Sequence, residues 1–104
     1  MMSYHLIHPL FPTGRILISP AAQALGVDLH RFIRRHYSGD WGETRPEDID
    51  ENREALESGD AILSQYRVTD PSGAVHTLVV MTEMDRTYTV LHLLDESLGE
   101  PSGE

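Results

Sequence analysis

The chain has 104 residues and a formal net charge of −9, from seventeen acids against eight arginines, and it contains no cysteine. This length fits one domain, and the lack of cysteine excludes disulfides and thiolate metal sites. The negative charge argues against direct binding to nucleic acid, because phosphates would be repelled. We find no apolar run long enough to span a membrane and no signal-peptide pattern, so we expect a cytoplasmic protein.

The first half of the chain predicts one strand and three helices. Residues 15–18 form a short β-branched run that is typical of a strand. Residues 20–25 follow a serine and begin with a proline, which predicts a helix of about two turns before the next glycine. Apolar side chains recur at helical spacing over 29–37, and a third helix is predicted over 46–58.

The second half changes to a period of two. Strands are predicted over 61–68, 74–82 and 87–94, and the middle one is apolar on both faces, as a central strand would be. The predicted fold class is α+β, with three N-terminal helices packed on a three- to four-stranded antiparallel meander. We expect a single domain over 1–94, followed by an acidic, flexible tail over 95–104.

The tetrapeptide Gly39-Asp40-Trp41-Gly42 follows the second predicted helix and holds the only tryptophan of the chain. One interpretation makes it the lip of a binding site, with Trp41 as a stacking surface. The other is structural: the glycines permit a left-handed turn, Trp41 fills the core, and Asp40 accepts main-chain N–H groups of the following helix. We favour the structural interpretation, because a single tryptophan is usually part of a core.

A second polar group, Glu83, Asp85 and Arg86, lies at the corner between the last two predicted strands. Glu83 and Asp85 are candidates for a carboxylate pair that serves acid–base chemistry or holds a divalent cation. We favour a salt-bridged hairpin corner instead, because Arg86 offers a neutralising partner beside them.

Asn52 lies one helical turn from the apolar residues of the third predicted helix, so we expect its side chain to face inward. A buried asparagine must be hydrogen-bonded, and Asp40, Arg86 or a main-chain group could supply the bond. We therefore predict a polar network that joins the 39–42 loop, Asn52 and Arg86 and that fixes the helices on the sheet.

Acidic residues are concentrated in residues 43–60, which hold eight acids against two arginines. Such a segment can be a solvated surface, or it can dock on a basic surface, for example the nucleic-acid-binding face of another protein. The candidate partner-binding residues are Glu43, Glu47, Asp48, Asp50, Glu51, Glu54 and Glu57.

Other candidate sites are weaker. Arg31, Arg34 and Arg35 form a small basic patch that could contact nucleic acid, but in so acidic a chain we expect them to pair with nearby acids. The histidine spacing does not fit a zinc site and no nucleotide-binding fingerprint is present, so we predict no metal and no cofactor. The first or third strand of the meander leaves a sheet edge through which a homodimer could form.

Several segments, taken in order, resemble a family of small, uncharacterised proteins encoded on bacterial plasmids and integrative elements. The matching pieces include Ile16-Leu17-Ile18-Ser19-Pro20, His36-Tyr37-Ser38-Gly39-Asp40-Trp41-Gly42 and the corner Thr82-Glu83-x-Asp85-Arg86. The chain departs from the family at residues 78–81, where an aromatic residue is common, and in its acidic last ten residues. The resemblance implies an accessory protein of a mobile element and no particular reaction.

We therefore expect a non-enzymatic accessory protein that binds a basic protein partner through its acidic helix. Mobile elements often carry small acidic proteins that block restriction or CRISPR systems, so the resemblance implies an inhibitor of host defence. A first alternative is a small ligand-binding or hydrolytic domain with a site between the 39–42 loop and the 83–86 corner. A second alternative is a nucleic-acid binder that uses the basic patch.

Overall fold

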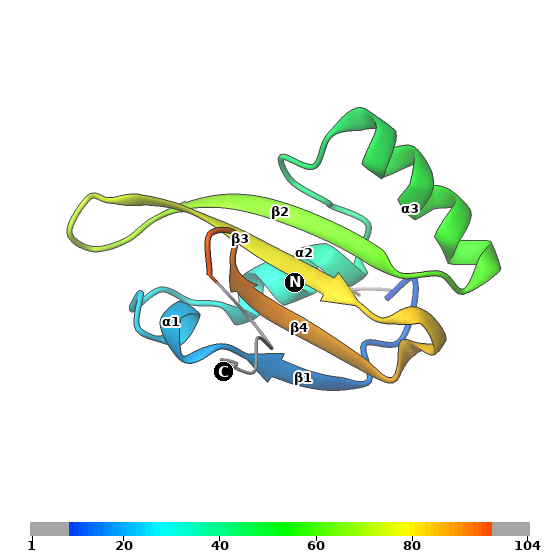
Figure 1. Ribbon diagram of the computed structural model, residues 1–104, viewed down its shortest axis with the longest axis horizontal. Coiled ribbons are helices and arrows are strands. Elements are labelled where there is room, and N and C mark those ends of the chain that lie inside the picture. The colour runs from blue at the N-terminus through cyan, green and yellow to red at the C-terminus, as the bar shows by residue number, and fades with distance from the viewer. Residues whose placement is uncertain (1–8, 97–104) are drawn as a thin grey trace, which may run out of the picture.

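A four-stranded sheet in the strand order β1-β4-β3-β2 organises the protein, of which a computed structural model describes residues 9–96 (Figure 1). In chain order the elements are β1 (Arg15–Ile18), α1 (Pro20–Gln23), α2 (His30–Tyr37), α3 (Pro46–Ser58), β2 (Ile62–Thr69), β3 (Val75–Thr82), the 3₁₀ turn η1 (Met84–Arg86) and β4 (Tyr88–Leu93). The predicted α+β class is confirmed, with three α-helices and one sheet over the described residues.

The sheet is mixed, so the predicted purely antiparallel meander is wrong. Strands β2, β3 and β4 pair antiparallel, whereas β1 lies parallel to β4, with Leu17 opposite Val90. Parallel pairing needs a long connection, which the three helices and two further strands supply. The helices also do not form an N-terminal block, because β1 precedes them and η1 falls between β3 and β4.

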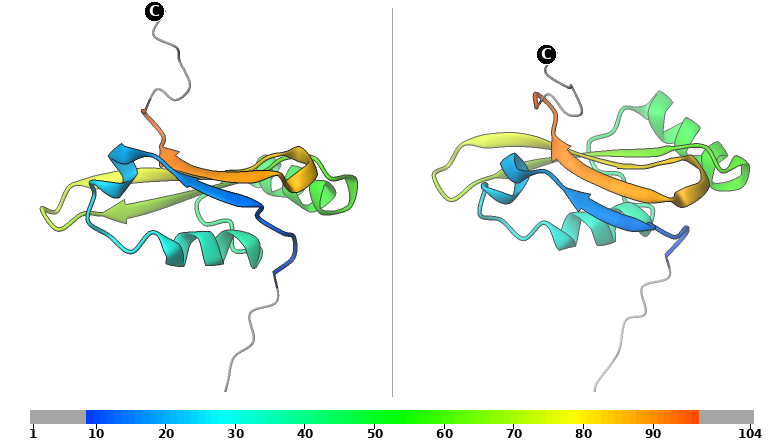
Figure 2. Two further views of the ribbon diagram at one scale, coloured as in Figure 1. Left: turned by 90° about the horizontal axis from the view of Figure 1, so that it is seen from below. Right: turned by 60° about the horizontal axis from the view of Figure 1, so that its bottom comes forward.

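Helix α2 covers one face of the sheet, and no described helix lies across the other face (Figure 2). Phe32 and Ile33 of α2 pack against Tyr66, Leu78 and Leu91 of the sheet, and all five side chains are buried. These are the apolar positions that helical and strand periodicity predict to face inward. The main core therefore lies between α2 and one face of the sheet.

Helix α3 lies beside the outer edge of β2 (Figure 1). The Asn52 side chain donates to the Leu63 carbonyl oxygen at 2.6 Å and accepts from the Leu63 N–H at 3.0 Å. The amide thus takes the place of a neighbouring strand at this residue. Asn52 is 2% exposed, which confirms that it faces inward and bonds a main-chain group.

The loop before α3 closes more of the same edge. The Glu43 N–H donates to the Gln65 carbonyl at 2.8 Å, and the Gln65 N–H donates to the Thr44 hydroxyl at 2.9 Å. The Glu43 carboxylate accepts from the Arg67 N–H at 2.7 Å. Strand β4 lies between β1 and β3, and the loop and α3 cover the edge of β2. Neither outer strand of the predicted meander therefore has a free edge at the residues named above. A homodimer through a sheet edge remains a prediction that now involves β1.

The chain stays bonded to the fold two residues beyond the expected domain end. The Glu96 carboxylate accepts from the Ser19 hydroxyl at 2.8 Å and from the Leu93 N–H at 3.0 Å. These bonds join the end of β4 to the start of α1. The rest of the expected tail, from residue 97 onward, lies outside the described residues.

We expect Asn52→Ala to lower the free energy of unfolding by about 2 kcal/mol, because it leaves two main-chain groups of Leu63 without partners. Urea denaturation followed by circular dichroism measures the loss. Glu51→Ala is the matched control, since Glu51 is exposed on the same helix and its removal should change stability by less than about 0.5 kcal/mol. Equal stability of Asn52→Ala and the wild type would contradict the role given to Asn52.

Candidate functional site

The outer side of α3 is an acidic face whose five members are all exposed. They are Glu47, Asp50, Glu51, Glu54 and Glu57. Members of the set recur three and four residues apart, so they share one side of the helix. Asn52 and Ala55 point the opposite way and are buried, which fixes the acidic face toward solvent.

Arginines compensate little of this charge. Arg45 lies 3.1 Å from Asp48, and Arg53 lies 3.0 Å from Asp50, each three residues along the chain. Both arginine side chains are about two-thirds exposed (68% and 67%), so the pairs are screened by solvent. No ion pair within residues 9–96 involves the remaining members of the acidic face, which are Glu47, Glu51, Glu54 and Glu57.

Arg86 ties the C-terminal end of α3 to the sheet. Its guanidinium donates to the main-chain carbonyls of Ala55 at 2.8 Å, Gly59 at 3.2 Å and Asp60 at 2.6 Å. The Ala55 carbonyl also accepts from the Gly59 N–H that caps the helix, and carbonyls at this end lie at the negative end of the helix dipole. A cation held there by several bonds therefore fixes the position of α3.

The predicted salt-bridged corner is wrong, because in the described structure Arg86 bonds main-chain carbonyls and pairs with neither Glu83 nor Asp85. The Glu83 carboxylate accepts from the Met84 N–H at 2.9 Å and from the Tyr88 hydroxyl at 3.1 Å. The bond to Glu83 raises the pKa of Tyr88. Asp85 and Arg86 have φ of +68° and +58°, a left-handed conformation that is uncommon for side-chain-bearing residues.

Trp41 belongs to the core, which confirms the structural interpretation of this residue. Its side chain is 7% exposed and packs with Phe11, Ala55 and Ile62. The indole N–H donates to the His36 carbonyl at 3.1 Å, so the end of α2 is fastened to the same cluster. The tryptophan presents no stacking surface to a ligand.

Asp40 has a local role at the end of α2. Its carboxylate pairs with Arg35 at 2.7 Å and accepts from the Gly42 N–H at 3.3 Å, so its predicted bond to the following helix is replaced by one within the loop. The bond from Arg35 lowers the pKa of Asp40. At Gly42, φ is +65° and a Cβ would lie 2.4 Å from the Gln65 carbonyl oxygen, so only glycine allows the loop to approach β2.

The residues of the expected ligand site do not converge. Asp40 bonds at the end of α2, whereas the Asp85 N–H bonds the Gly59 carbonyl at the far end of α3. No hydrogen bond in the described part of the chain joins Asp40, Asn52 and Arg86, so their contacts are separate rather than one network. A shallow hollow of about 220 Å³ lies elsewhere, lined by Val75, His76, Thr77, Leu94 and Asp95.

Two of the three arginines of the basic patch are engaged within the chain. Arg35 pairs with Asp40, and its guanidinium also lies 4.7 Å from the centre of the Tyr66 ring. Arg31 lies over the Phe32 ring at 4.6 Å. Only Arg35 has the acidic partner that the sequence led us to expect, whereas Arg31 contacts an aromatic ring and the ion pairs of the described residues do not include Arg34.

A buried chain of hydrogen bonds through His36 has no counterpart in the sequence predictions. The His36 ring lies 2.6 Å from the Ser64 hydroxyl through Nδ1 and 2.9 Å from the Thr82 hydroxyl through Nε2. Thr82 in turn contacts the Thr89 hydroxyl at 2.7 Å, and Thr89 donates to the Thr13 carbonyl at 2.7 Å. The four side chains in this chain are fully buried.

The Thr13 carbonyl fixes the proton positions along this chain, because a carbonyl oxygen can only accept. Thr89 therefore donates to it, Thr82 donates to Thr89, and His36 donates to Thr82 from a protonated Nε2. The Ser64 hydroxyl then donates to His36 Nδ1, which leaves the imidazole neutral. Burial, assisted by the positive charge of Arg86, lowers the pKa of His36 to about 4.

The sequence does hold a faint signal for this chain of bonds. Ser64 lies on the same face of β2 as the buried Ile62 and Tyr66, and His36 lies on the apolar stripe of α2. Polar residues at such positions need partners, but their pairing depends on the relative placement of α2, β2 and β3. Because Ser64 and His36 are fully buried, this serine–histidine pair stabilises the interior and has no access to a substrate.

Comparison with protein-family models, curated proteins and solved structures finds no match for this chain. The resemblance to mobile-element proteins therefore rests on the sequence segments alone. Over residues 9–96, no three His, Asp or Glu side chains are placed to hold a metal ion together. No helix in that range has the length and apolar character needed to cross a membrane.

We expect the wild type to lose stability as pH falls from about 6.5 to about 4, because unfolded His36 binds a proton in this window and folded His36 does not. The depressed pKa of His36 contributes about 3 kcal/mol to the free energy of unfolding above pH 6.5 relative to pH 4. Urea denaturation at a series of pH values measures the slope. His36→Gln should flatten it, whereas His30→Gln, at an exposed position of the same helix, should leave it unchanged. The same slope in wild type and His36→Gln would contradict the buried neutral imidazole.

Proposed function

We propose that this protein is a non-enzymatic accessory factor of a mobile genetic element that docks on a basic protein through the acidic face of α3. The observation that carries the proposal is an exposed helix side with four carboxylates that have no ion-pair partner in the described structure. Helix α3 is held from both directions, by Asn52 on β2 and by Arg86 at its end. The acids are therefore presented on a rigid support.

The arrangement of charge on α3 is unfavourable for an isolated helix. Glu47 and Glu51, like Asp50 and Glu54, are four residues apart, where two like charges cost about 0.2–0.5 kcal/mol per pair. A partner with arginine or lysine side chains opposite these positions would relieve the repulsion. Complementary charge of this kind raises association rates and selects among partners more than it raises affinity.

The role proposed for such binding is inhibition of a host defence protein. Proteins that bind nucleic acid present basic surfaces to the phosphates, and an acidic helix competes for the same surface. The sequence resemblance to proteins of plasmids and integrative elements supports this role. The enzyme and ligand-site alternative has less support, because Asp40 pairs with Arg35, Glu83 bonds Tyr88 and the Asp85 N–H bonds the Gly59 carbonyl, so the three acids do not bond a common group.

Reversing the charge of Glu47, Glu51 and Glu54 to lysine should abolish capture of a basic partner from a host lysate at low salt. The wild type should retain the partner at about 50 mM salt and release most of it at about 500 mM, because screening weakens exposed charge pairs. Immobilised protein, with the captured material identified by mass, gives the measurement.

The matched control reverses Asp95, Glu100 and Glu104 to lysine, which changes the net charge by the same amount at positions outside α3. This control variant should capture the partner as the wild type does. Equal loss in both variants would show that net charge alone attracts the partner, and equal retention in both would rule out docking through α3.

A further inference from the structure

The two outer strands of the sheet differ in how their edges are covered. The edge of β2 is closed by α3 and the loop before it, through Asn52 and Thr44. No described element lies along the outer edge of β1 (Figure 1). Ile16 and Leu17 of this strand are 41% and 43% exposed, although both are large apolar residues. An open edge of this kind is a template for pairing with another strand.

The main-chain groups on this edge can be assigned from the bonds to β4. The N–H groups of Arg15 and Ser19 donate to carbonyls at and just before β4, at 3.2 and 3.0 Å. Main-chain groups alternate in direction along a strand, so those of Ile16 and Ile18 point away from the sheet. The Ile18 carbonyl accepts from the exposed Gln23 side chain at 3.1 Å. The other outward groups, the N–H and carbonyl of Ile16 and the N–H of Ile18, have no partner among the described residues.

These outward groups select one register for a second copy of β1. Two copies related by a twofold axis pair antiparallel, and only outward-pointing residues form hydrogen-bonded pairs. With Leu17 opposite Leu17 of the second copy, Ile16 lies opposite Ile18, and every outward group of β1 is used. A register centred on Ile16 would instead pair Ile18 with Gly14. Gly14 has φ of +65° and a Cβ there would collide with the Thr87 carbonyl, so the chain turns toward β4 at this point and does not continue the edge.

The same register brings opposite charges together. Arg15 falls opposite Ser19 of the second copy, and residues directly opposite have Cβ atoms about 5 Å apart. Ser19 keeps an extended backbone (φ −69°, ψ 151°), and its hydroxyl donates to the Glu96 carboxylate at 2.8 Å. Arg15 and Ser19 are each two residues from Leu17, so their side chains share one face of the strand. The carboxylate bound at Ser19 of one copy therefore meets the guanidinium of the other.

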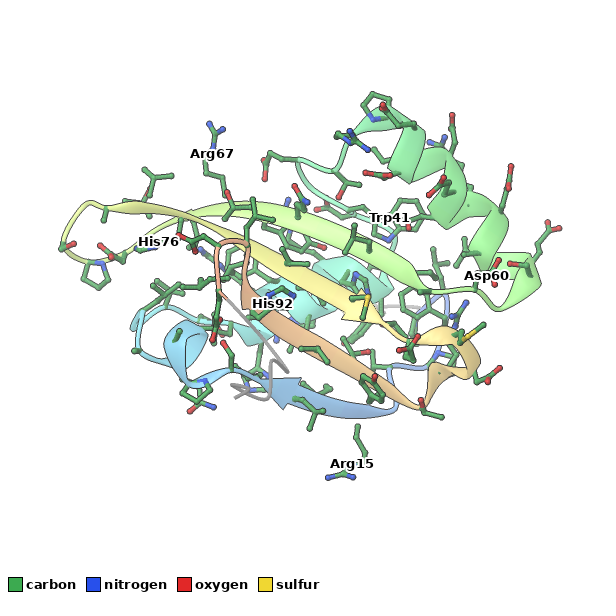
Figure 3. The ribbon with its side chains drawn as sticks, in the orientation of Figure 1. Arg15, Trp41, Asp60, Arg67, His76 and His92 are labelled. Carbon is green, nitrogen blue, oxygen red and sulfur yellow. The ribbon has the colours of Figure 1, made fainter. Side chains whose placement is uncertain are left out.

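Arg15 is available for this contact. None of the ion pairs within residues 9–96 involves it. In Figure 3 its side chain extends past the edge of β1, away from the rest of the sheet. Because the axis is twofold, each dimer would contain the Arg15–Glu96 pair twice.

We propose that β1 pairs antiparallel with β1 of a second copy, with Leu17 opposite Leu17, and that Arg15 of each copy pairs with Glu96 of the other. The two sheets then form one continuous sheet, with an acidic face of α3 beyond each end, because α3 borders β2. The charge of −9 on each copy opposes association. That repulsion is limited at about 150 mM salt, where the Debye length is about 8 Å, since α3 lies at the edge of each sheet far from the contact.

Charge exchange tests the ion pairs. Light scattering at about 0.5 mM protein, a concentration suited to a small and weak interface, should give the wild type twice the mass of one chain. Arg15→Glu and Glu96→Arg should each be monomeric, because like charges then meet. An equimolar mixture of the two variants should form the dimer, because both contacts regain opposite charges. Arg34→Glu is the matched control: it makes the same charge change at an exposed position of α2 and should remain dimeric.

Cross-linking tests the register, in a chain that has no cysteine of its own. Leu17→Cys should form a disulfide-linked dimer under a mild oxidant, because residues opposite in a non-hydrogen-bonded pair have Cα atoms about 4.5 Å apart. Ile16→Cys is the matched control. Its two copies lie diagonally, about 7–8 Å apart, so it should cross-link about tenfold more slowly.

Ile16→Pro removes an outward N–H and leaves the bonds to β4 intact, so it should be a folded monomer by circular dichroism and light scattering. A monomeric wild type, or a dimer that survives Ile16→Pro, would overturn pairing through β1. Faster cross-linking of Ile16→Cys than of Leu17→Cys would overturn the register, and a mixture of charge variants that stays monomeric would overturn the ion pairs. Reversal of Glu47, Glu51 and Glu54 should leave the dimer unchanged, so this inference and the proposed function fail independently.

Discussion

Closure of the β2 edge by a side-chain amide is the interaction on which the rest of this structure depends. Helix α3 has a thin apolar stripe and cannot be held by hydrophobic burial alone, since Asn52 occupies the middle of its inner side. The pair of bonds to Leu63 fixes both the position of α3 and its rotation about its own axis. Because the rotation of α3 is set, its carboxylates must face solvent. The edge of β2 that α3 covers is unavailable to other strands.

Hydrogen-bonded polar side chains also position α2 in the interior of the protein. His36 connects α2 to β2 and β3 through hydroxyl groups, and every donor in this chain of bonds has one acceptor. Buried polar groups add little net stability, but once paired they exclude the alternative packings that a purely apolar layer would permit. Helices α2 and α3 are therefore placed on the sheet by polar bonds as well as by apolar packing.

Local features were predictable from the sequence because their causes are local. The bounds of β1 and α3 follow from β-branched residues, a proline start and a glycine end, and the inward direction of Asn52 follows from helical spacing. Pairing that joins distant segments was not predictable. Periodicity does not tell a parallel edge strand from an antiparallel one. Likewise, the two carboxylates beside Arg86 in the sequence suggest an ion pair, and nothing in the sequence indicates that Arg86 bonds helix carbonyls instead.

The parallel pairing of β1 with β4 has a consequence for how the chain folds. Strand β1 lies near the start of the described chain, yet its partner β4 is the last strand described. Most of the domain must therefore be in place before the two strands can meet. Contacts between such distant segments are slow to form, because chain entropy is lost in closing the intervening loop before any stabilising bond between the two strands exists. We infer that the antiparallel hairpins assemble first and that β1 docks late, which makes β1 the strand most exposed to competing pairings during folding.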